Sequence, residues 1–145
     1  MVPTPGYKNL PHTTDAYIEA SGSTFEAALE YAGQALFDTM CDLKSISVSL
    51  TEKVDATGSD EVRLTYDWLE KLLLKFELEH KVYSKFNVKV TGSPSVGLHL
   101  AGTISGEPYD KKKHAGKVEV KAVTFHKMEI VREGAITTVR FILDL

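Results

Sequence analysis

The spacing of apolar residues between positions 25 and 40 predicts an amphipathic helix. Phe25, Leu29, Leu36 and their apolar neighbours recur at intervals of three and four residues, as on a helix that buries one face. The preceding Ser23-Thr24-Phe25-Glu26 has the form of a capping box, in which a hydroxyl and a carboxylate satisfy free amides. The helix is therefore predicted to begin at this box.

A second stripe of the same period predicts a helix over residues 60–78. Thr57-Gly58-Ser59-Asp60 supplies a turn and a plausible N-cap before it. Trp68 lies beside the stripe, which favours a place in the core or in a subunit contact. Stacking on a ligand is the alternative role for this side chain.

Alternating apolar and polar residues predict half-buried strands elsewhere in the chain. The predicted strands cover residues 16–20, 45–55, 86–90, 96–104, 118–131 and 137–143. Gly102 is a candidate position for a bend or bulge. Residues 1–6 are predicted to be a loose lead-in, and residues 106–116 a polar loop.

The order of these elements is β-α-β-α-β-β-β-β. Two helices packed on one face of a mainly antiparallel sheet would bury both apolar patterns, which is an α+β two-layer sandwich. A length of 145 residues fits one domain, and no linker composition interrupts it. We therefore predict a single domain over residues 1–145.

Composition and charge restrict the function classes. The net charge is −3 and the isoelectric point about 5.9, whereas general nucleic-acid binders carry a basic domain or stripe. The run Lys111-Lys112-Lys113-His114 is read as a solvated loop, so direct nucleic-acid binding is not expected. No apolar stretch approaches the length of a membrane span, and the start of the chain lacks signal-peptide character.

The cysteine content indicates a reducing compartment. Cys41 is the sole cysteine, so no internal disulfide can form, and a cytoplasmic protein is expected. Cys41 follows the first apolar helical stripe, which favours a core or helix-end position over a nucleophilic one.

Carboxylates near the two ends of the chain form the main candidate site. Asp144 stands beside the α-carboxylate of Leu145, and its phase along the last strand points it away from the apolar face. If this strand packs beside Asp15, three carboxylates meet, and hard cations favour such oxygen ligands. The alternative is that these are unrelated surface carboxylates, with Asp15 in an Asx turn.

The chain resembles the archease family at several separated places. Three segments carry the most specific resemblance: His12-Thr13-Thr14-Asp15, Lys121-Ala122-Val123-Thr124-Phe125-His126, and Phe141-Ile142-Leu143-Asp144-Leu145. Further similar segments include Trp68-Leu69-Glu70-Lys71 and Ser105-Gly106-Glu107. The resemblance covers nearly the whole chain, and the departure is Thr14, where the family usually has alanine.

The resemblance implies an accessory protein and not an enzyme. Archeases activate the GTP-dependent tRNA-splicing RNA ligase by promoting its guanylylation and turnover, and can broaden its choice of nucleotide. The family's metal site corresponds to Asp15, Asp144 and Leu145, with calcium as the usual ion. Carboxylate ligands alone do not separate calcium from magnesium.

Five further residues are expected near the metal ligands or in the contact with the ligase. They are His12, Glu107, His114, Lys121 and His126. For the histidines the competing role is structural, as hydrogen-bonded residues of a turn or strand.

Two other functions remain open at this point. The carboxylates could hold a catalytic ion for phosphoester hydrolysis, although no activated nucleophile is recognisable. The protein could also be a chaperone-like binding module whose metal is incidental.

Overall fold

Antiparallel strands and two long helices make up most of the chain that the structure describes. The computed structural model describes residues 4–11 and 15–145. The strands are β1 (Gly6–Leu10), β2 (Ala16–Gly22), β3 (Leu50–Gly58), β4 (Lys81–Ser93), β5 (Gly97–Pro108), β6 (Ala122–Glu133) and β7 (Ile136–Asp144). The helices are α1 (Phe25–Met40), α2 (Glu61–Glu79), the short α3 (Lys111–His114) and the 3-10 turn η1 (Leu43–Ser45).

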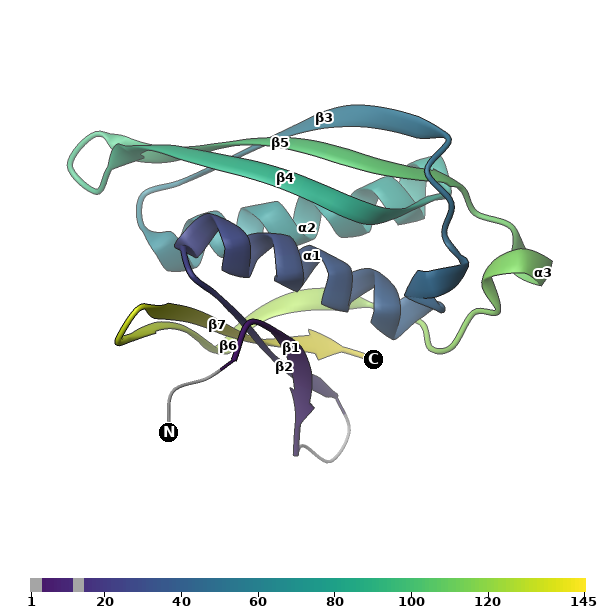
Figure 1. Ribbon diagram of the computed structural model, residues 1–145, viewed down its shortest axis with the longest axis horizontal. Coiled ribbons are helices and arrows are strands. Elements are labelled where there is room, and N and C mark those ends of the chain that lie inside the picture. The colour runs from purple at the N-terminus through teal and green to yellow at the C-terminus, as the bar shows by residue number, and fades with distance from the viewer. Residues whose placement is uncertain (1–3, 12–14) are drawn as a thin grey trace.

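The strands form two sheets with the long helices between them. One sheet has the order β1-β2-β7-β6 and the other β3-β5-β4, and Figure 1 shows α1 and α2 in the layer that separates them. The α+β class with antiparallel sheets is therefore confirmed. The single sheet of a two-layer sandwich is wrong, because α1 contacts both β4 and β2, and α2 contacts both β3 and β6.

Burial around the helices explains why two sheets are needed. Along α1, Ala28 and Ala32 are as fully buried as Leu29 and Leu36, so more than one stripe of this helix must be covered. On α2, Trp68 is also fully buried, and its indole N–H donates to the carbonyl of Leu29 at 2.9 Å. The core prediction for Trp68 is thus confirmed.

Side-chain caps begin both helices, but α1 is capped by Thr24 with Ala27, and not Glu26, at the third helical position, so the predicted capping box is wrong. The Thr24 hydroxyl accepts from the amide of Ala27 at 3.0 Å, and the Asp60 carboxylate accepts from the amide of Arg63 at 2.8 Å. Cys41 ends α1 as its C-cap and is fully buried. Both helices therefore lie within one residue of their predicted ranges.

Three local predictions are corrected by tertiary packing. Gly102 lies in a regular part of β5, where an added Cβ would come within 2.9 Å of the Trp68 ring, so it provides space for this ring and no bend. The polar segment 106–116 contains the end of β5 and α3. Part of the expected lead-in and the residues after it form β1, which pairs with β2 from Gly6 to Leu10.

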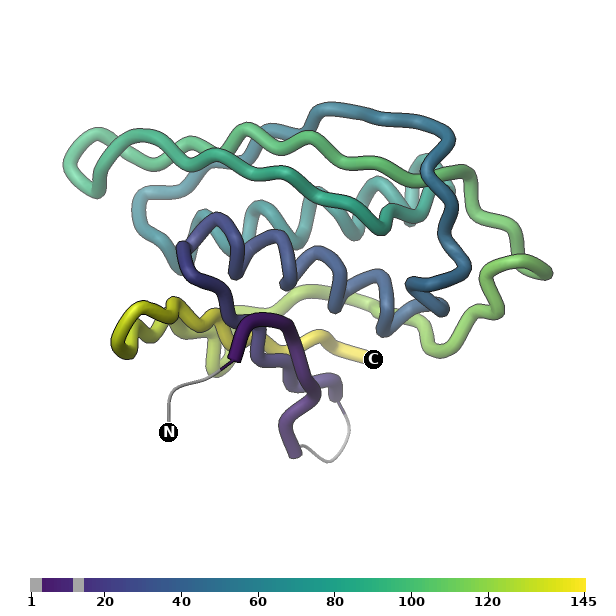
Figure 2. Tube along the Cα trace, viewed as in Figure 1, coloured from purple at the N-terminus to yellow at the C-terminus, as the bar shows by residue number. Residues whose placement is uncertain are grey.

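Strands from the two ends of the chain are neighbours. β2 pairs with β7 in antiparallel register from Ala16 with Leu143 to Gly22 with Thr137. The trace in Figure 2 brings the purple start of the chain and its yellow end together in this sheet. This pairing positions Asp15, directly before β2, beside the end of β7.

Charged side chains of the helices bind the outer edges of the three-stranded sheet. At the β4 edge, the Glu30 carboxylate accepts from the amide of Val88 at 2.9 Å. At the β3 edge, Asp67 accepts from the amide of Thr57 at 2.9 Å, and the Lys71 ammonium donates to the carbonyl of Asp55 at 3.0 Å. Some backbone groups that have no strand neighbour are satisfied in this way.

Candidate functional site

The candidate metal ligands belong to the face of the four-stranded sheet that points away from the helices. Along β7, Phe141 and Leu143 belong to the hydrophobic core. Because successive side chains of a strand alternate between faces, Arg140 and Asp144 lie on the outer face. The orientation predicted for Asp144 is confirmed by its exposure.

The register of the sheet places Asp15, which precedes β2, beside Asp144 at the end of β7. Asp15 directly precedes Ala16, which pairs with Leu143 of β7. Extending this register by one residue sets Asp15 opposite Asp144, where Cβ atoms are typically ~4.5–5.5 Å apart. On the other side of β7, Ala122 pairs with Asp144, and the Lys121 amide donates to the Asp144 carbonyl at 2.7 Å.

The chemistry of these donors fits a hard divalent cation. Carboxylate oxygens on neighbouring strands can share one ion at the short distances that calcium requires. Leu145 follows Asp144 directly and packs partly buried against the core. Within the described residues, no group of three or more His, Cys, Asp and Glu side chains is arranged to hold a metal.

A ladder of ion pairs crosses all four strands on the same outer face. Arg140 donates from Nε to Glu19 at 2.9 Å and from a terminal nitrogen to Glu129 at 2.7 Å, and Lys8 lies 3.6 Å from Glu19. The bonds to Glu129 and Glu19 raise the pKa of Arg140 above its ordinary value. Glu19 is 7% exposed, so its carboxylate depends on these cations for its charge partners. The ladder therefore favours the observed register of the four strands.

Strand β6 contains a bulge next to the candidate ligands. Its pairing with β7 shifts register between Thr124 and Glu129. Inside this interval Lys127 has a left-handed backbone with φ 57°, a conformation that costs a non-glycine residue ~1 kcal/mol. The Lys127 ammonium lies 5.7 Å from the centroid of the Tyr17 ring on β2. Bulges of this kind often redirect side chains beside functional sites.

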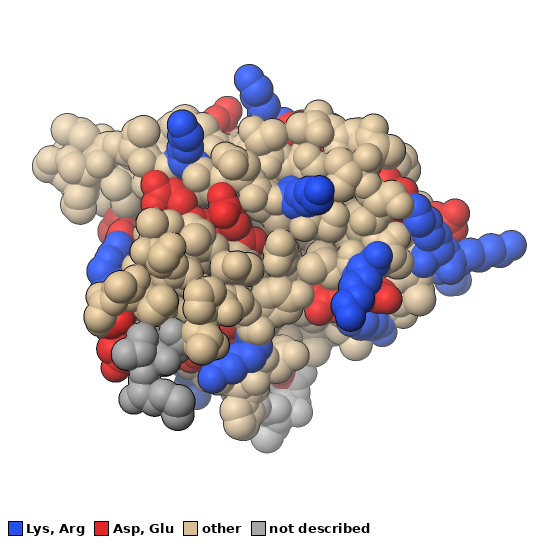
Figure 3. Space-filling view, viewed as in Figure 1, with Lys and Arg blue, Asp and Glu red and all other residues tan. Residues whose placement is uncertain are grey.

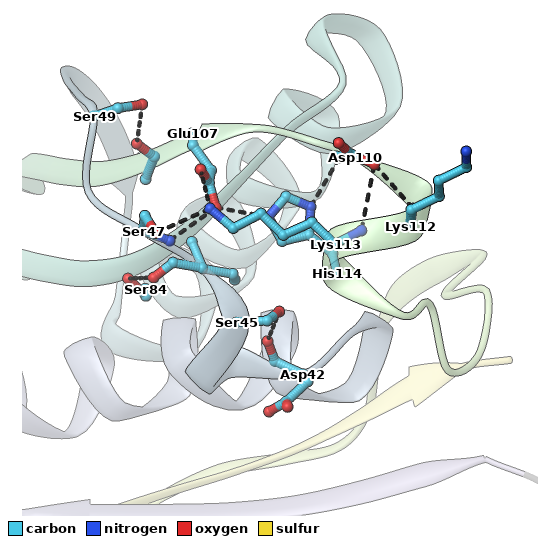
Figure 4. Close-up of polar contacts among 12 residues, drawn as sticks. Asp42, Ser45, Ser47, Ser49, Ser84, Glu107, Asp110, Lys112, Lys113 and His114 are labelled. Carbon is cyan, nitrogen blue, oxygen red and sulfur yellow. Dashed lines mark hydrogen bonds and ion pairs between the residues drawn. The ribbon is translucent and has the colours of Figure 1, made fainter.

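Glu107 and His114 form a separate buried cluster in the region where β5 ends and α3 follows. Figure 4 shows Glu107 receiving hydrogen bonds from three directions. They come from the Ser47 amide at 2.8 Å, the Lys113 ammonium at 2.8 Å and His114 Nε2 at 2.7 Å. His114 is fully buried, so the cluster holds α3 against the end of β5.

The protonation of this cluster follows from its hydrogen bonds. His114 Nδ1 accepts from the Asp110 amide at 2.8 Å, which leaves the ring proton on Nε2 to donate to Glu107. Burial opposes ionisation of Glu107, but the bonds from Lys113, His114 and the Ser47 amide outweigh it and lower its pKa to about 2. Glu107 is therefore an ionised carboxylate that binds three groups of its own chain.

A cavity of about 640 Å³ opens between the first turns of α1 and α2 and the β4–β5 hairpin. Phe25, Leu98 and Ile130 give it apolar walls. Arg132 in its lining is bound by Glu61 at 2.8 and 2.5 Å. None of the predicted site residues lines this cavity.

Comparison with known proteins decides the family. The model of the Archease protein family matches residues 7–145. The chain belongs to the archease family. This match includes Asp15, Asp144 and Leu145, and all three specific motifs on which the sequence resemblance was based.

Relatives and solved structures of the family agree with this assignment. The protein archease of Methanothermobacter thermautotrophicus is 41% identical over 97% of this chain and 99% of its own length. The protein archease of Pyrococcus furiosus is 35% identical over 87% of this chain and 88% of its own. The solution structure of protein 1598 from Methanobacterium thermoautotrophicum superposes with a TM-score of 0.81 at 36% identity, covering 97% and 99% of the two chains.

A more distant structure shares the fold. The crystal structure of an archease from Thermotoga maritima, described as a possible chaperone, has a TM-score of 0.63 at 18% identity. It covers 95% of this chain and 96% of its own. The archease fold is thus preserved at low sequence identity.

The structure separates the predicted archease site residues into two groups. Lys121 and the exposed His126 belong to the segment that flanks Asp144. Glu107 and His114 bind each other in the buried cluster beside α3. His12 lies outside the described residues.

Sequence reasoning did not identify the charge ladder or the β6 bulge. The ladder gave no signal within one segment, because Lys8, Glu19 and Arg140 lie on three different strands whose pairing no local pattern specifies. The bulge gave no signal either, since His126-Lys127-Met128 continues the alternation.

The surface view and the helices give two further observations. On the face drawn in Figure 3, lysine and arginine side chains are interspersed with acidic ones and do not form one continuous stripe. No helix in the described part of the chain is both long and apolar enough to cross a membrane.

Proposed function

We propose that this archease is a metal-binding accessory protein that activates the GTP-dependent tRNA-splicing RNA ligase. It promotes guanylylation and turnover of the ligase without catalysing a reaction itself, and it can alter the ligase's choice of nucleotide. Family membership supports the accessory role, and the archease resemblance implies this partner. The single structural observation behind the proposal is the register that sets Asp15 opposite Asp144.

Asp15, Asp144 and the terminal carboxylate of Leu145 are proposed to hold the ion. Two like charges ~4 Å apart near a protein surface repel by roughly 1–4 kcal/mol, and a divalent cation removes this repulsion. Calcium is the proposed ion, because carboxylates on two strands and a chain terminus suit its flexible coordination, and magnesium is the alternative. When bound, the ion supplies a positive charge on an exposed sheet face.

The residues around the ligands give the site its rigidity. Strand β7, which carries Asp144, and strand β2, which follows Asp15, are held in register by the ladder through Arg140 and Glu19. The Lys121 amide fixes the backbone of Asp144 from the opposite side. A preformed surface of this kind can bind the guanylylation-competent state of the ligase better than its other states, and so shift the ligase toward that state.

Single-turnover guanylylation of a matched ligase tests the proposal. Wild-type protein titrated against the ligase and GTP is expected to increase the rate of guanylylation, whereas Asp144→Asn is expected to remove most of this stimulation. Asp55→Asn is the matched control, since Asp55 is an exposed aspartate of the other sheet. Equal stimulation by wild type and Asp144→Asn would show that the carboxylates are not the effector, and would favour the chaperone-like role.

Calorimetric titration with calcium and then with magnesium tests the metal part separately. Wild type is expected to bind one ion, and Asp144→Asn or a chain lacking Leu145 to bind it more weakly. At a calcium concentration of 100 times Kd, binding adds ~2.7 kcal/mol to the free energy of unfolding. Metal-stimulated cleavage of a phosphoester by the purified protein alone would instead support the hydrolase function.

A further inference from the structure

The outer face of the three-stranded sheet is covered by no other element of the part of the chain that the structure describes. Figure 1 shows α1 and α2 on one side of β3, β5 and β4, and no helix or strand on the other side. Residues that point outward alternate with core residues such as Val54, Val88 and Leu100, as the pleat of a strand requires. None of the exposed large apolar side chains of the described residues belongs to these three strands.

Three lysines of this face have no acidic partner. Lys53, Lys85 and Lys89 are exposed, and none of them forms an ion pair with a carboxylate of residues 4–11 or 15–145. Asp55, the acidic residue on the outward side of β3, lies 3.4 Å from Nε2 of His99. The face is therefore positively charged, although the net charge of the whole chain is −3.

The register of the sheet spaces these three cations. Lys53 pairs with Thr103, and Thr103 pairs with Asn87, which lies midway between Lys85 and Lys89. The Cα atoms of Lys85 and Lys89 are ~13 Å apart along β4, and that of Lys53 lies two strands away, at ~10 Å. Polar side chains of moderate size occupy the positions between them, so the three ammonium groups stand on a flat surface.

The residue types of this face match a nucleic-acid backbone better than a protein surface. The cores of protein interfaces are enriched in aromatic residues and depleted of lysine and serine. Lysine, serine, threonine and asparagine are instead the side chains that contact phosphates and sugars. Because the face has no aromatic ring, it offers no platform for stacking the bases of a single strand. A double helix, whose bases are already stacked, is the better match.

A flat face suits an RNA helix better than a DNA helix. The minor groove of A-form RNA is wide and shallow, and it displays 2′-hydroxyls beside the phosphates. The major groove of DNA is instead read by an inserted helix or ribbon, and its minor groove is only ~6 Å wide. Each strand of the face carries an exposed threonine hydroxyl that can bind a 2′-hydroxyl: Thr51 on β3, Thr103 on β5 and Thr91 on β4.

We propose that the outer face of the three-stranded sheet binds the phosphate backbone of an RNA double helix without reading its sequence. Lys53, Lys85 and Lys89 neutralise phosphates, and the threonine hydroxyls bind sugar oxygens. The net charge of the chain averages over both sheets and so conceals this face. The inference goes beyond the proposed function, in which the carboxylates on the opposite side of the molecule act on the ligase.

Fluorescence anisotropy with a labelled RNA duplex of about 16 base pairs, the span of a small RNA-binding domain, tests the inference. At about 50 mM KCl, wild-type protein is expected to bind with a Kd of about 10–100 μM, as non-specific contacts do. The triple variant Lys53→Gln/Lys85→Gln/Lys89→Gln is expected to raise this Kd tenfold or more. For three neutralised phosphates the logarithm of the wild-type binding constant should fall with the logarithm of salt concentration with a slope of about −2 to −3. This slope should approach zero in the variant.

A second triple variant controls for net charge. Lys44→Gln/Lys111→Gln/Lys112→Gln removes the same charge from exposed lysines of η1 and α3. Its Kd for the RNA duplex is expected to stay within twofold of wild type. Both triple variants change exposed side chains only, so they are expected to unfold within a few degrees of wild type.

The outcomes separate this inference from the proposed function. Absence of RNA binding by wild type, or equal losses in the two triple variants, would overturn the inference. Displacement of the RNA by polyglutamate at a lower concentration of charge than by unlabelled duplex would assign the face to acidic proteins instead. Without RNA, wild type and the variant of the sheet face are expected to stimulate ligase guanylylation equally, so loss of RNA binding leaves the proposed function intact.

Discussion

Truncation of Glu107 tests how much the buried cluster beside α3 stabilises the fold. Glu107→Ala removes the acceptor for the fully buried His114 Nε2–H and for the Ser47 amide. A buried donor left without a partner costs ~1–3 kcal/mol. His114 is the buried one of these two donors, whereas Ser47 is exposed and its amide can bind water, so the variant is expected to lose about 2–3 kcal/mol of the free energy of unfolding. At roughly 3 °C per kcal/mol for a domain of this size, its Tm should fall by about 6–9 °C.

The isosteric variant separates hydrogen bonding from charge. Glu107→Gln keeps an oxygen for the Ser47 amide or His114 but loses the ion pair with Lys113, so a loss of only ~1–2 kcal/mol is expected. Urea denaturation monitored by circular dichroism measures both variants against wild type. A Glu107→Ala variant within 1 kcal/mol of wild type would refute the reasoning, as would equal losses for the two variants.

The Glu107 carboxylate makes the free energy of unfolding depend on pH. Its pKa is lowered from an ordinary 4.5 to about 2 in the folded protein. Because the pKa of Glu107 is lower in the folded chain than in the unfolded chain, the ionised carboxylate stabilises the fold at pH values above the unfolded pKa. This contribution is lost as the pH falls from about 4.5 toward 2. The stability difference between wild type and Glu107→Gln should therefore narrow from pH 6 to pH 3. A constant difference would contradict the assignment of charge to Glu107.

Three further variants or reagents test other parts of the structure. Arg140→Ala leaves the buried Glu19 carboxylate without its closest cation and should cost about 2–4 kcal/mol in urea denaturation; a loss below 0.5 kcal/mol would disprove the role of the ladder. Gly106→Ala would place a Cβ 1.9 Å from the Val82 carbonyl, so a Tm decrease equivalent to about 2–3 kcal/mol is expected, and an unchanged Tm would contradict the packing. Cys41 should react slowly with thiol reagents at pH 7 in the folded state, because burial raises its pKa to about 11; labelling as fast as in urea would show that the thiol is accessible.

Helices were predictable from the sequence because their signals are local. Thr24 and Asp60 cap their own helices, and the apolar stripe lies within each segment. Strand β1 was missed because Lys8 and Asn9 interrupt any apolar alternation, and its pairing with β2 supplies the stability that its own sequence lacks. Helix α3 was missed because its buried residue, His114, stands alone among lysines.

The division into two sheets could not be derived from alternation. A period of two identifies a strand that is buried on one side, but it does not say which layer covers that side. The small residues Ala28 and Ala32 beside the main stripe of α1 were the available signal, because they permit close approach of a second sheet. Reading them as part of a single apolar face led to the two-layer prediction.

The candidate site depends on local strand phase and also on the pairing of strands that are far apart in the sequence. The outward orientation of Asp144 followed from the phase of the last strand. Its proximity to Asp15 depends on the pairing of β2 with β7, across more than a hundred residues, which no local pattern specifies. The archease resemblance implied that Asp15 and Asp144 belong to one metal site, and the register is consistent with that.

The helix side chains at the edges of the three-stranded sheet also bear on how the protein behaves at high concentration. An open strand edge is a template for another chain, and such edges promote aggregation when their backbone groups are free. Here Glu30, Asp67 and Lys71 already bind amide and carbonyl groups at both edges. An incoming strand must first displace these charged side chains and bury them or return them to water. Neutral replacements at these three positions should thus leave the fold intact while making concentrated solutions prone to ordered self-association.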